Sequence, residues 1–598
     1  MLEIPGYSHA STQPVCVIGM TLPDSLSFDH PSVDTFLSNG FLVHELPFGE
    51  EDDRIRALCD RISFLANSLL QAIKVPVFAQ AKIVEVHYIQ EKRAHRVRLL
   101  APTIANIPQE IVLRAYAFAL KILNEIHPAY DFEAAFETID TEFVKKFKSL
   151  IPGGISTVSI THAAFKNRVP FLHLGAGVYQ LGWGSDARRF DRSTNDKDTA
   201  LGNKLASDKR LTNQILLQAG FPVPRQIAVS SLDAAQKAGR ELGYPVVLKP
   251  AKLERGEGVT IDIDSDDALR DAYLKKQEAF ENLLVEQQIS GVCHRVFVAG
   301  KKVRHVVARH PMHVVGDGIH SIRELAEIEN EAQQKLGKHW RRPKLEVTET
   351  GLRMFSQLGL DADSVPPKGL RVPFQRIESS ELGGISEDLM GITHPDNIAL
   401  AVDVAAFSGL DVLGLDIITE DISKAWHENG AKINEINFAP MVSPYRDWVQ
   451  KGLDTYVQES FPRRGRIPIH VFSGGSNALS TARHYQSELF DKGEPHFLCS
   501  RHVTLKPDGT PCPDDLKDNL FLRAHALLLN KAAEGIIVVL QDMSVLKTGF
   551  PFDSVSRKVF VDDQFVSMTT DAPAGPDVRA QIAQAVDQLP VFSVEFSG

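Results

Sequence analysis

The stretch LDVLGLDIITEDISKAWHENGAKINEINFAP, residues 410–440, decides the fold and contains the first candidate site. Its apolar run from Val412 to Thr419 predicts a buried strand, and Lys432 to Phe438 predicts a second strand. Asp416 places a carboxylate inside the first of these strands. Because an unpartnered charge is costly to bury, a carboxylate in an apolar strand indicates a chemical role.

Glu435 and Asn437 extend this candidate site. They are two residues apart on the second predicted strand, so both side chains point to the same face. With Asp416 they supply two carboxylates and an amide oxygen, a ligand set that suits Mg²⁺, which bridges phosphates. The alternative is that Glu435 and Asn437 face solvent on an edge strand, and these residues alone leave both interpretations open.

A second candidate site lies upstream, around Lys249. This lysine ends a predicted strand, residues 244–250, and precedes the loop LERGEGV at 253–259. Gly256 and Gly258 would let backbone N–H groups approach a phosphate closely, and Lys249 would supply a positive charge. The alternative interpretation of the loop is an ordinary hairpin turn.

Strands and helices alternate around both sites, which predicts an α/β or α+β architecture. Helices are expected at 112–126, 208–219 and 396–407, and a Ser-x-x-Glu capping box at Ser321 predicts a further helix start. Additional strands are expected at 260–263, 283–287, 295–298, 467–472 and 535–540.

The order of these features resembles that of the ATP-grasp ligases, and most closely the cyanophycin synthetases. The resemblance covers about residues 160–465. The runs that carry it are ASDKRLTNQILLQAGFPVP (206–224), GYPVVLKP (243–250), GEGVTI (256–261), HRVFV (294–298), HVVGDGIHSIREL (313–325), THPDN (393–397), GLDIIT (414–419) and EINFAP (435–440).

The resemblance implies a set of roles for residues of this chain. ATP would be bound by Lys209, Lys249, the glycines Gly256 and Gly258, and the segment Glu286, Gln287 and Ile289. Mg²⁺ would be held by Asp416, Glu435 and Asn437, and the catalytic side chains would be Lys249, Arg295 and Arg309. The implied reaction phosphorylates a carboxylate with ATP and then forms an amide through the acyl phosphate.

Three positions depart from the pattern of the cyanophycin synthetases. Cys293 stands where an acidic residue is usual, Glu381 replaces a serine, and Met441 replaces a glycine. These departures leave two alternatives open. One is an ATP-grasp ligase that makes a different small peptide or isopeptide, and the other is a nucleotide-binding pseudoenzyme.

The expected organisation is an N-terminal α/β domain at 1–160, a central ATP-grasp domain at 161–465 and a small lobe at 466–598. In the cyanophycin synthetases a Mur-ligase-like domain follows the sequence RIPI, which stands here at 466–469. The phosphate-binding loop of that domain appears here as GGSNALS (474–480), with Ala478 and Leu479 where Lys and Thr are needed. We therefore expect a truncated, degenerate Mur-ligase-like lobe.

This pattern is similar to type 2 cyanophycin synthetases, which implies substrates and partners. The expected substrates are β-aspartyl-arginine dipeptides, joined to a polymer end, and the expected assembly is a homodimer. No nucleic acid or membrane is expected, and the expected compartment is the cytoplasm.

Composition agrees with a globular protein of several domains. The chain has 598 residues, 43% of them hydrophobic and 24% charged, and 65 Lys plus Arg against 76 Asp plus Glu give a net charge of −11. These values exclude a disordered chain and argue against a general nucleic-acid coat. The five cysteines show no CxxC spacing, which argues against a disulfide scaffold.

Overall fold

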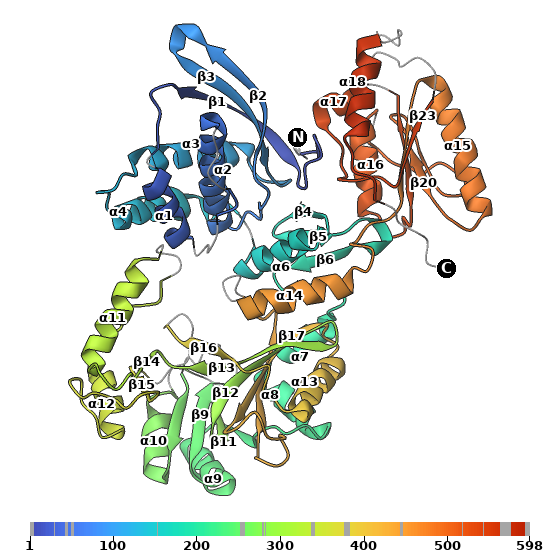
Figure 1. Ribbon diagram of the computed structural model, residues 1–598. Helices are drawn as coiled ribbons and strands as arrows, with labels where there is room; N and C mark the ends of the chain where they lie inside the picture. The colour runs from blue at the N-terminus through green and yellow to red at the C-terminus, as the bar shows by residue number, and fades with distance from the viewer. Residues whose placement is uncertain are drawn as a thin grey trace. The chain divides into compact units, whose positions relative to one another are not determined.

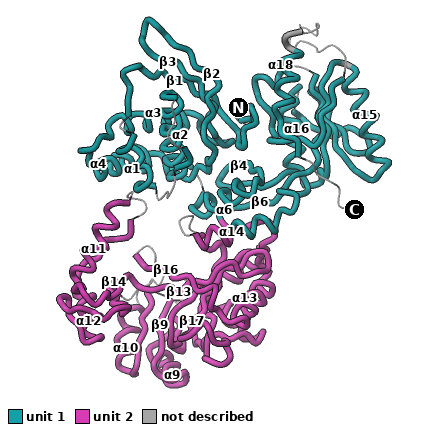
Figure 2. The backbone as a smooth tube through the Cα atoms, viewed as in Figure 1, with its two compact units in different colours: residues 1–192, 443–445, 453–598 teal, residues 193–442, 446–452 magenta. Residues whose placement is uncertain are grey.

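The computed structural model describes residues 5–28, 30–41, 46–48, 53–151, 153–250, 258–277, 280, 283–336, 341–375, 383–442, 447–516, 518–541, 543–561 and 576–592. The chain forms two compact units, coloured separately in Figure 2. Unit 1 holds residues 1–192, 443–445 and 453–598, and unit 2 holds residues 193–442 and 446–452. The segment 161–192 thus falls in unit 1, and the three expected domains stay a prediction.

The N-terminal part of unit 1 combines an antiparallel sheet with helices (Figure 1). The sheet has the order β1-β3-β2, from β1 (Val15–Pro23), β3 (Ala94–Pro102) and β2 (Lys82–Ile89). The helices are α1 (His30–Gly40), α2 (Arg54–Ala72), α3 (Gln109–Glu125), α4 (Phe132–Thr138), α5 (Lys145–Phe147) and α6 (Ile155–Lys166). Helix α3 confirms the helix expected at 112–126, and its apolar stripe is buried against α2.

The C-terminal part of unit 1 contains a largely parallel sheet of order β21-β20-β22-β19-β23. Its strands are β19 (Ile469–Ser473), β20 (Phe497–Cys499), β21 (Thr504–Leu505), β22 (Ile536–Leu540) and β23 (Arg557–Phe560). Its helices are α15 (Ser476–Asp491), α16 (Leu520–Leu529), α17 (Ser544–Thr548) and α18 (Pro576–Asp587). The strands expected near 467–472 and 535–540 are confirmed.

Ala478 and Leu479 both pack into the core of this lobe, and Ala478 is fully buried. The position where a phosphate-binding loop carries its lysine is therefore part of the apolar core in this lobe. The strands β4 (Phe171–Gly175), β5 (Val178–Leu181) and β6 (Arg188–Asp191) of unit 1 pair antiparallel and belong to a four-stranded sheet, and α14 (Asp447–Ser460) belongs partly to each unit.

Unit 2 contains an antiparallel sheet that we call the lysine sheet because it carries Lys249. Its order is β10-β9-β11-β8, from β10 (Thr260–Ile263), β9 (Val246–Pro250), β11 (Leu283–Gln287) and β8 (Gln226–Val229). One face packs on α9 (Leu232–Leu242) and α10 (Asp266–Leu274), where Leu248 and Val285 are buried.

A second antiparallel sheet of unit 2, which we call the carboxylate sheet, carries Asp416. Its order is β16-β13-β12-β17-β18, from β16 (Ile385–Asp388), β13 (Lys302–His310), β12 (Val292–Ala299), β17 (Val412–Thr419) and β18 (Lys432–Phe438). Helices α7 (Ala200–Ala206), α8 (Lys209–Gln218) and α13 (Pro395–Ser408) pack against it. These bounds confirm the strands and helices expected in this region.

A smaller layer completes unit 2. It consists of β14 (His313–Val315), β15 (Arg371–Pro373), α11 (Ile322–Gln334) and α12 (Glu349–Gln357), which share a core around Phe355. The expected capping box is confirmed, because Ser321 and Glu324 satisfy each other's backbone N–H groups at the start of α11. Among the described helices, none has the length and apolar content that a membrane span needs.

We predict that His470 makes the C-terminal lobe sensitive to acid. Burial, followed by the charges of His496 and Arg557, lowers the pKa of His470 to about 3 from a usual value of 6.5. Between these two pH values the unfolded chain binds a proton that the folded lobe does not, so stability falls as the pH drops below 6.5. His470→Phe should therefore remove about 2 kcal/mol of the stability lost between pH 7 and pH 5.

The measurement is urea unfolding of the full chain at both pH values. His484→Phe is the control, since this histidine on α15 is 81% exposed. An equal loss in the wild type and in His470→Phe would contradict the assignment.

Candidate functional site

The carboxylate sheet has two chemically different faces. Val296, Leu415 and Ile436 point toward the core beneath α13, where all three are buried. The opposite face carries Arg295, Asp416 and Glu435, which lie directly across from one another on β12, β17 and β18. Successive side chains of a strand point to opposite faces of the sheet, so apolar residues fill one face and polar residues fill the other.

An irregularity in β18 places Glu435 on the polar face. Ile417 pairs with Ile433 while Asp416 pairs with Glu435, so β18 has one extra residue, Asn434, at this point. The bulge lets Ile433 and Ile436 both enter the core although they are three positions apart. Without the extra residue, Glu435 and Ile433 would share a face.

A buried ion pair lies at the centre of the polar face. The guanidinium of Arg295 donates to both oxygens of Asp416, and its Nη2 lies 2.9 Å from Oδ2. Asn437 Nδ2 also donates to Asp416 Oδ2 at 3.2 Å, and Arg309 Nη1 lies 3.9 Å from the same atom. The side chains of Asp416 and Arg295 are only 6% and 11% exposed.

These neighbours set the charge of Asp416. Burial by itself raises the pKa of this carboxyl, but the charge and hydrogen bonds of Arg295 outweigh burial and hold the pKa below its usual value. The same pairing raises the pKa of Arg295 against its own burial. Asp416 is therefore ionised at neutral pH despite its burial.

The lysine sheet presents a second buried pair. Lys249 Nζ donates to Glu286 Oε1 at 2.7 Å, and the two side chains are 11% and 7% exposed. In the register of β9 and β11, Lys249 pairs with Leu284, so Glu286 lies two residues further along on the same face. This face is the one opposite the α9–α10 core.

A cavity of about 1280 Å³ joins the polar faces of the two sheets. Its walls include Lys209, Lys249, Glu286, Gln287, Ile289 and Glu435 from the residues expected at the site. Lys209 begins α8 and its Nζ lies 3.5 Å from Glu435 Oε2. The volume exceeds the usual 300–1,000 Å³ of a site for one small molecule, so the cavity has room for a nucleotide and a second substrate.

The remaining expected residues lie beside this cavity or outside the described chain. Arg295, Arg309 and Asn437 meet at Asp416, whose cross-strand neighbour Glu435 lines the cavity. Gly256 lies outside the described residues. Gly258 has a φ of +69° and an added Cβ would lie 2.8 Å from Pro250 Cγ, so the chain requires glycine there.

Sequence reasoning missed a large part of the cavity wall. Lys432 and Asn434 line it from the bulged strand, and Gln288 lines it after β11. Further lining residues also lie outside the motifs, namely Met312, Lys344, Glu346, Thr348, Thr350, Phe374 and Gln375. The spacing of three between Ile433 and Ile436 is the one sequence signal that marks the bulge.

The polar face fits a divalent cation by the chemistry of its donors. Asp416 and Glu435 supply carboxylates from directly opposed positions, and Asn437 adds an amide. Within the described ranges, no group of three or more His, Cys, Asp or Glu side chains could hold a metal. A cation here would have two carboxylates and the amide oxygen of Asn437 as candidate ligands and would share Asp416 with Arg295.

Two of the three departures from the family pattern are described. Cys293 is half-buried on β12, and Met441 is 63% exposed just after β18. Glu381 lies outside the described residues.

The chain is similar in sequence to one known domain family and to several known proteins. A family model for the ATP-binding domain of the carbamoyl-phosphate synthase L chain matches residues 208–338. A cyanophycin synthetase of Trichormus variabilis is 33% identical over 422 residues, 68% of this chain and 46% of that protein. One from Synechocystis is 33% identical over 341 residues, 55% of this chain and 39% of its own length.

A solved bifunctional glutathione synthetase from Pasteurella multocida covers 74% of each chain at 17% identity with a TM-score of 0.42. The chain spans less than half the length of the cyanophycin synthetases that it matches. The sequence matches identify cyanophycin synthetases as homologues and an ATP-grasp domain in the chain.

We predict that Arg295 and Asp416 depend on each other for their contribution to stability. Arg295→Leu leaves Asp416 buried with less compensation, which should lower the free energy of unfolding by about 3–5 kcal/mol. The double variant Arg295→Leu/Asp416→Leu should recover part of this loss, because it removes the buried charge as well.

Urea unfolding of the two single variants and the double variant measures this coupling. Arg353→Leu serves as the control, since Arg353 on α12 is 79% exposed. Additive losses in the double variant would show that the two charges do not depend on each other.

Proposed function

Because this chain is a homologue of the cyanophycin synthetases and contains an ATP-grasp domain, we propose that unit 2 joins a carboxylate to an amine at the expense of ATP. The favoured substrates are β-aspartyl-arginine dipeptides, added to the end of a cyanophycin-like polymer. The observation that carries the proposal is one cavity lined by Lys209, Lys249 and Glu435, with Asp416 directly opposite Glu435. Two lysine side chains and a set of oxygen ligands around one cavity suit a nucleoside triphosphate with its metal ion.

Each side chain has a role in this proposal. Lys209 and Lys249 neutralise phosphate charge, and the segment from Glu286 to Ile289 holds the adenine. Asp416, Glu435 and Asn437 would hold Mg²⁺, which would supply positive charge to offset the negative charge of the phosphates during transfer. Arg309 lies within 3.9 Å of Asp416 and reaches the transferred phosphoryl group from β13.

The proposed chemistry has two steps. A carboxylate oxygen attacks the γ-phosphorus, the bond between that phosphorus and the β–γ bridging oxygen breaks, and ADP leaves. The amine nitrogen then attacks the acyl carbon and loses a proton, and the C–O bond breaks so that phosphate leaves with the oxygen of the original carboxylate. Fixing the reactants in a desolvated cavity supplies most of the catalysis, because phosphoryl transfer depends mainly on positioning and charge.

The remaining parts of the molecule belong to the same proposal. We divide the chain into an N-terminal domain, an ATP-grasp domain and a C-terminal lobe that is a degenerate, truncated Mur-ligase-like domain. Buried Ala478 supports the absence of a second ATP site in that lobe. We also propose that the protein works in the cytoplasm as a homodimer.

A ligation assay tests this function. The full chain is incubated with ATP, Mg²⁺, a short cyanophycin primer and, in turn, β-aspartyl-arginine, free Asp, free Arg or other amino acids. Only β-aspartyl-arginine should give longer polymer, with one ADP formed for each bond, because one competent site makes one kind of bond. Mass spectrometry and ADP release measure the two products. Two ADP per added unit, or consumption of another amino acid without β-aspartyl-arginine, would contradict the proposal.

Matched lysine variants locate the reaction in the cavity. Lys249→Met should lower turnover at least about 100-fold, as expected when a preorganised charge at a transition state is lost. Lys275→Met, an exposed lysine just after α10, should keep wild-type turnover. Thermal unfolding of both variants checks that the change is in catalysis, since Lys249 also pairs with Glu286.

A further inference from the structure

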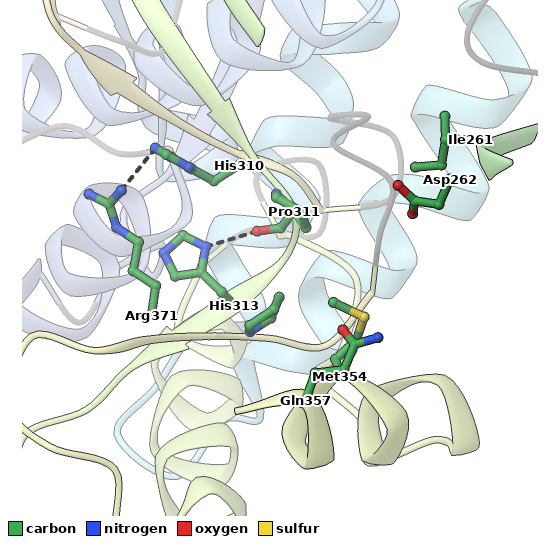
Figure 3. Close-up of a pocket in the computed structure, with 9 residues that line it drawn as sticks. Ile261, Asp262, His310, Pro311, His313, Met354, Gln357 and Arg371 are labelled. Atoms are coloured by element: carbon green, nitrogen blue, oxygen red, sulfur yellow. Dashed lines mark hydrogen bonds between the residues drawn. The ribbon is translucent and has the colours of Figure 1, made fainter. Parts of the chain in front are cut away.

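A separate cavity of about 400 Å³ lies in unit 2 (Figure 3). It is next to the cavity of about 1280 Å³ that we propose binds ATP, which we call the nucleotide cavity. Ile261 and Asp262 line both cavities, so this part of β10 is their common wall. Gln288 holds the wall in place, because its side chain accepts from the Asp262 backbone N–H at 2.7 Å and donates to Asp262 Oδ1 at 2.8 Å. None of the roles proposed above uses the second cavity.

One end of the second cavity carries a fixed guanidinium. Arg371 Nη2 donates to Glu387 Oε2 at 2.6 Å, and Arg371 Nη1 lies 3.1 Å from His310 Nε2. His310 Nε2 also lies 3.0 Å from Glu387 Oε2, and this one nitrogen can either accept from Arg371 or donate to Glu387, so the Arg371–Glu387 ion pair is the contact that fixes the guanidinium. Arg371 nevertheless stays 46% exposed, which leaves part of its planar fork available to a carboxylate.

His313 is the second polar group at this end. Its Nδ1 lies 2.8 Å from the carbonyl oxygen of Pro311, and a carbonyl only accepts, so Nδ1 carries a proton. Burial lowers the pKa of His313, so the ring is neutral at pH 7 and Nε2 is an acceptor. The rings of His310 and His313 meet edge to face with centroids 5.8 Å apart.

Asp262 makes the other side of the cavity acidic, and Gln357 and apolar residues also line the cavity. Figure 3 shows Asp262 on one side of Pro311, and Arg371 with the two histidines on the other. Met354 and Pro373 add apolar surface to the lining. A cation-binding carboxylate and an anion-binding guanidinium at opposite ends fit a ligand that carries both charges, with an aliphatic part between them.

We propose that this cavity binds one aspartyl-arginine unit of the substrate other than the unit that reacts, with a carboxylate at Arg371 and the guanidinium at Asp262. The proposal rests on the proposed function for the identity of the unit, while the charges and size come from the cavity itself. Bound there, the unit lies one strand away from the nucleotide cavity and anchors the chain whose end is being extended.

Equilibrium binding to the full chain tests this subsite without relying on catalysis. The probes are β-aspartyl-arginine and a primer of three such units, measured by calorimetry, with ADP and Mg²⁺ as a separate probe of the nucleotide cavity. Arg371→Gln and Asp262→Asn should each weaken primer binding at least about tenfold, since each removes a charged hydrogen-bonding group. Arg371→Gln, which changes a residue outside the lining of the nucleotide cavity, should bind ADP within about twofold of the wild type.

Two further variants keep the test decisive. Arg323, on α11, forms an exposed ion pair with Asp363. The control variant Arg323→Gln should bind the primer like the wild type. Met354→Trp fills the cavity without changing charge and should also weaken primer binding, so the result does not depend on disturbing the Arg371–Glu387 pair. Wild-type primer affinity in Arg371→Gln, Asp262→Asn and Met354→Trp would overturn the subsite.

The ligation assay separates this proposal from the proposed function. A wild-type chain that binds ADP but neither arginine-containing probe would also overturn the subsite. If the wild type binds the primer through Arg371 and Asp262 but forms no bond, the subsite holds and the proposed ligase activity fails. If ligation proceeds while the cavity variants keep primer affinity, the ligase activity holds and the subsite fails.

Discussion

The ion pair between Arg295 and Asp416 is the interaction on which the rest of the site depends. It lies on the polar face of a sheet whose other face is buried under α13, so the strands must keep apolar and charged residues strictly apart. A lone carboxylate at this depth would be protonated or would destabilise the sheet, whereas the paired carboxylate stays ionised. Its ionised carboxylate lies directly opposite Glu435 and accepts a hydrogen bond from Asn437, so the three oxygen-bearing side chains are grouped on one face.

The lysine sheet and the carboxylate sheet of unit 2 both carry charged side chains that are buried beside the cavity, and both hold these charges in pairs. Each buries one face against helices and turns charged side chains toward the common cavity, where Lys249 pairs with Glu286 and Lys209 approaches Glu435. Pairing offsets part of the cost of burying these charges in the absence of a ligand. When ATP and a metal ion bind, the phosphates would take the place of the carboxylates beside the lysines, and the metal would bind carboxylates that are already positioned.

The sequence alone predicted several strands of unit 2, such as those at 246–250 and 412–419, because they are short apolar runs with a few charged positions. It did not predict β8 or β13 to β16. It also singled out Lys209, Lys249 and Glu435, which the structure places on one cavity. Local patterns could not predict that Arg295 occupies both oxygens of Asp416, since the two residues are 121 positions apart. The second cavity was missed for the same reason, because His310, Arg371 and Glu387 converge only through the pairing of β13 with β16 and the packing of β15.

The most direct test of the account follows one oxygen atom. An acceptor whose reacting carboxylate carries ¹⁸O is extended with ATP and β-aspartyl-arginine, and the released phosphate is analysed by mass spectrometry. An acyl-phosphate route predicts one ¹⁸O in the phosphate for each bond formed, with ADP as the nucleotide product, because the carboxylate oxygen leaves with the phosphoryl group. Phosphate free of ¹⁸O, or AMP as the product, would contradict the mechanism assigned to this cavity.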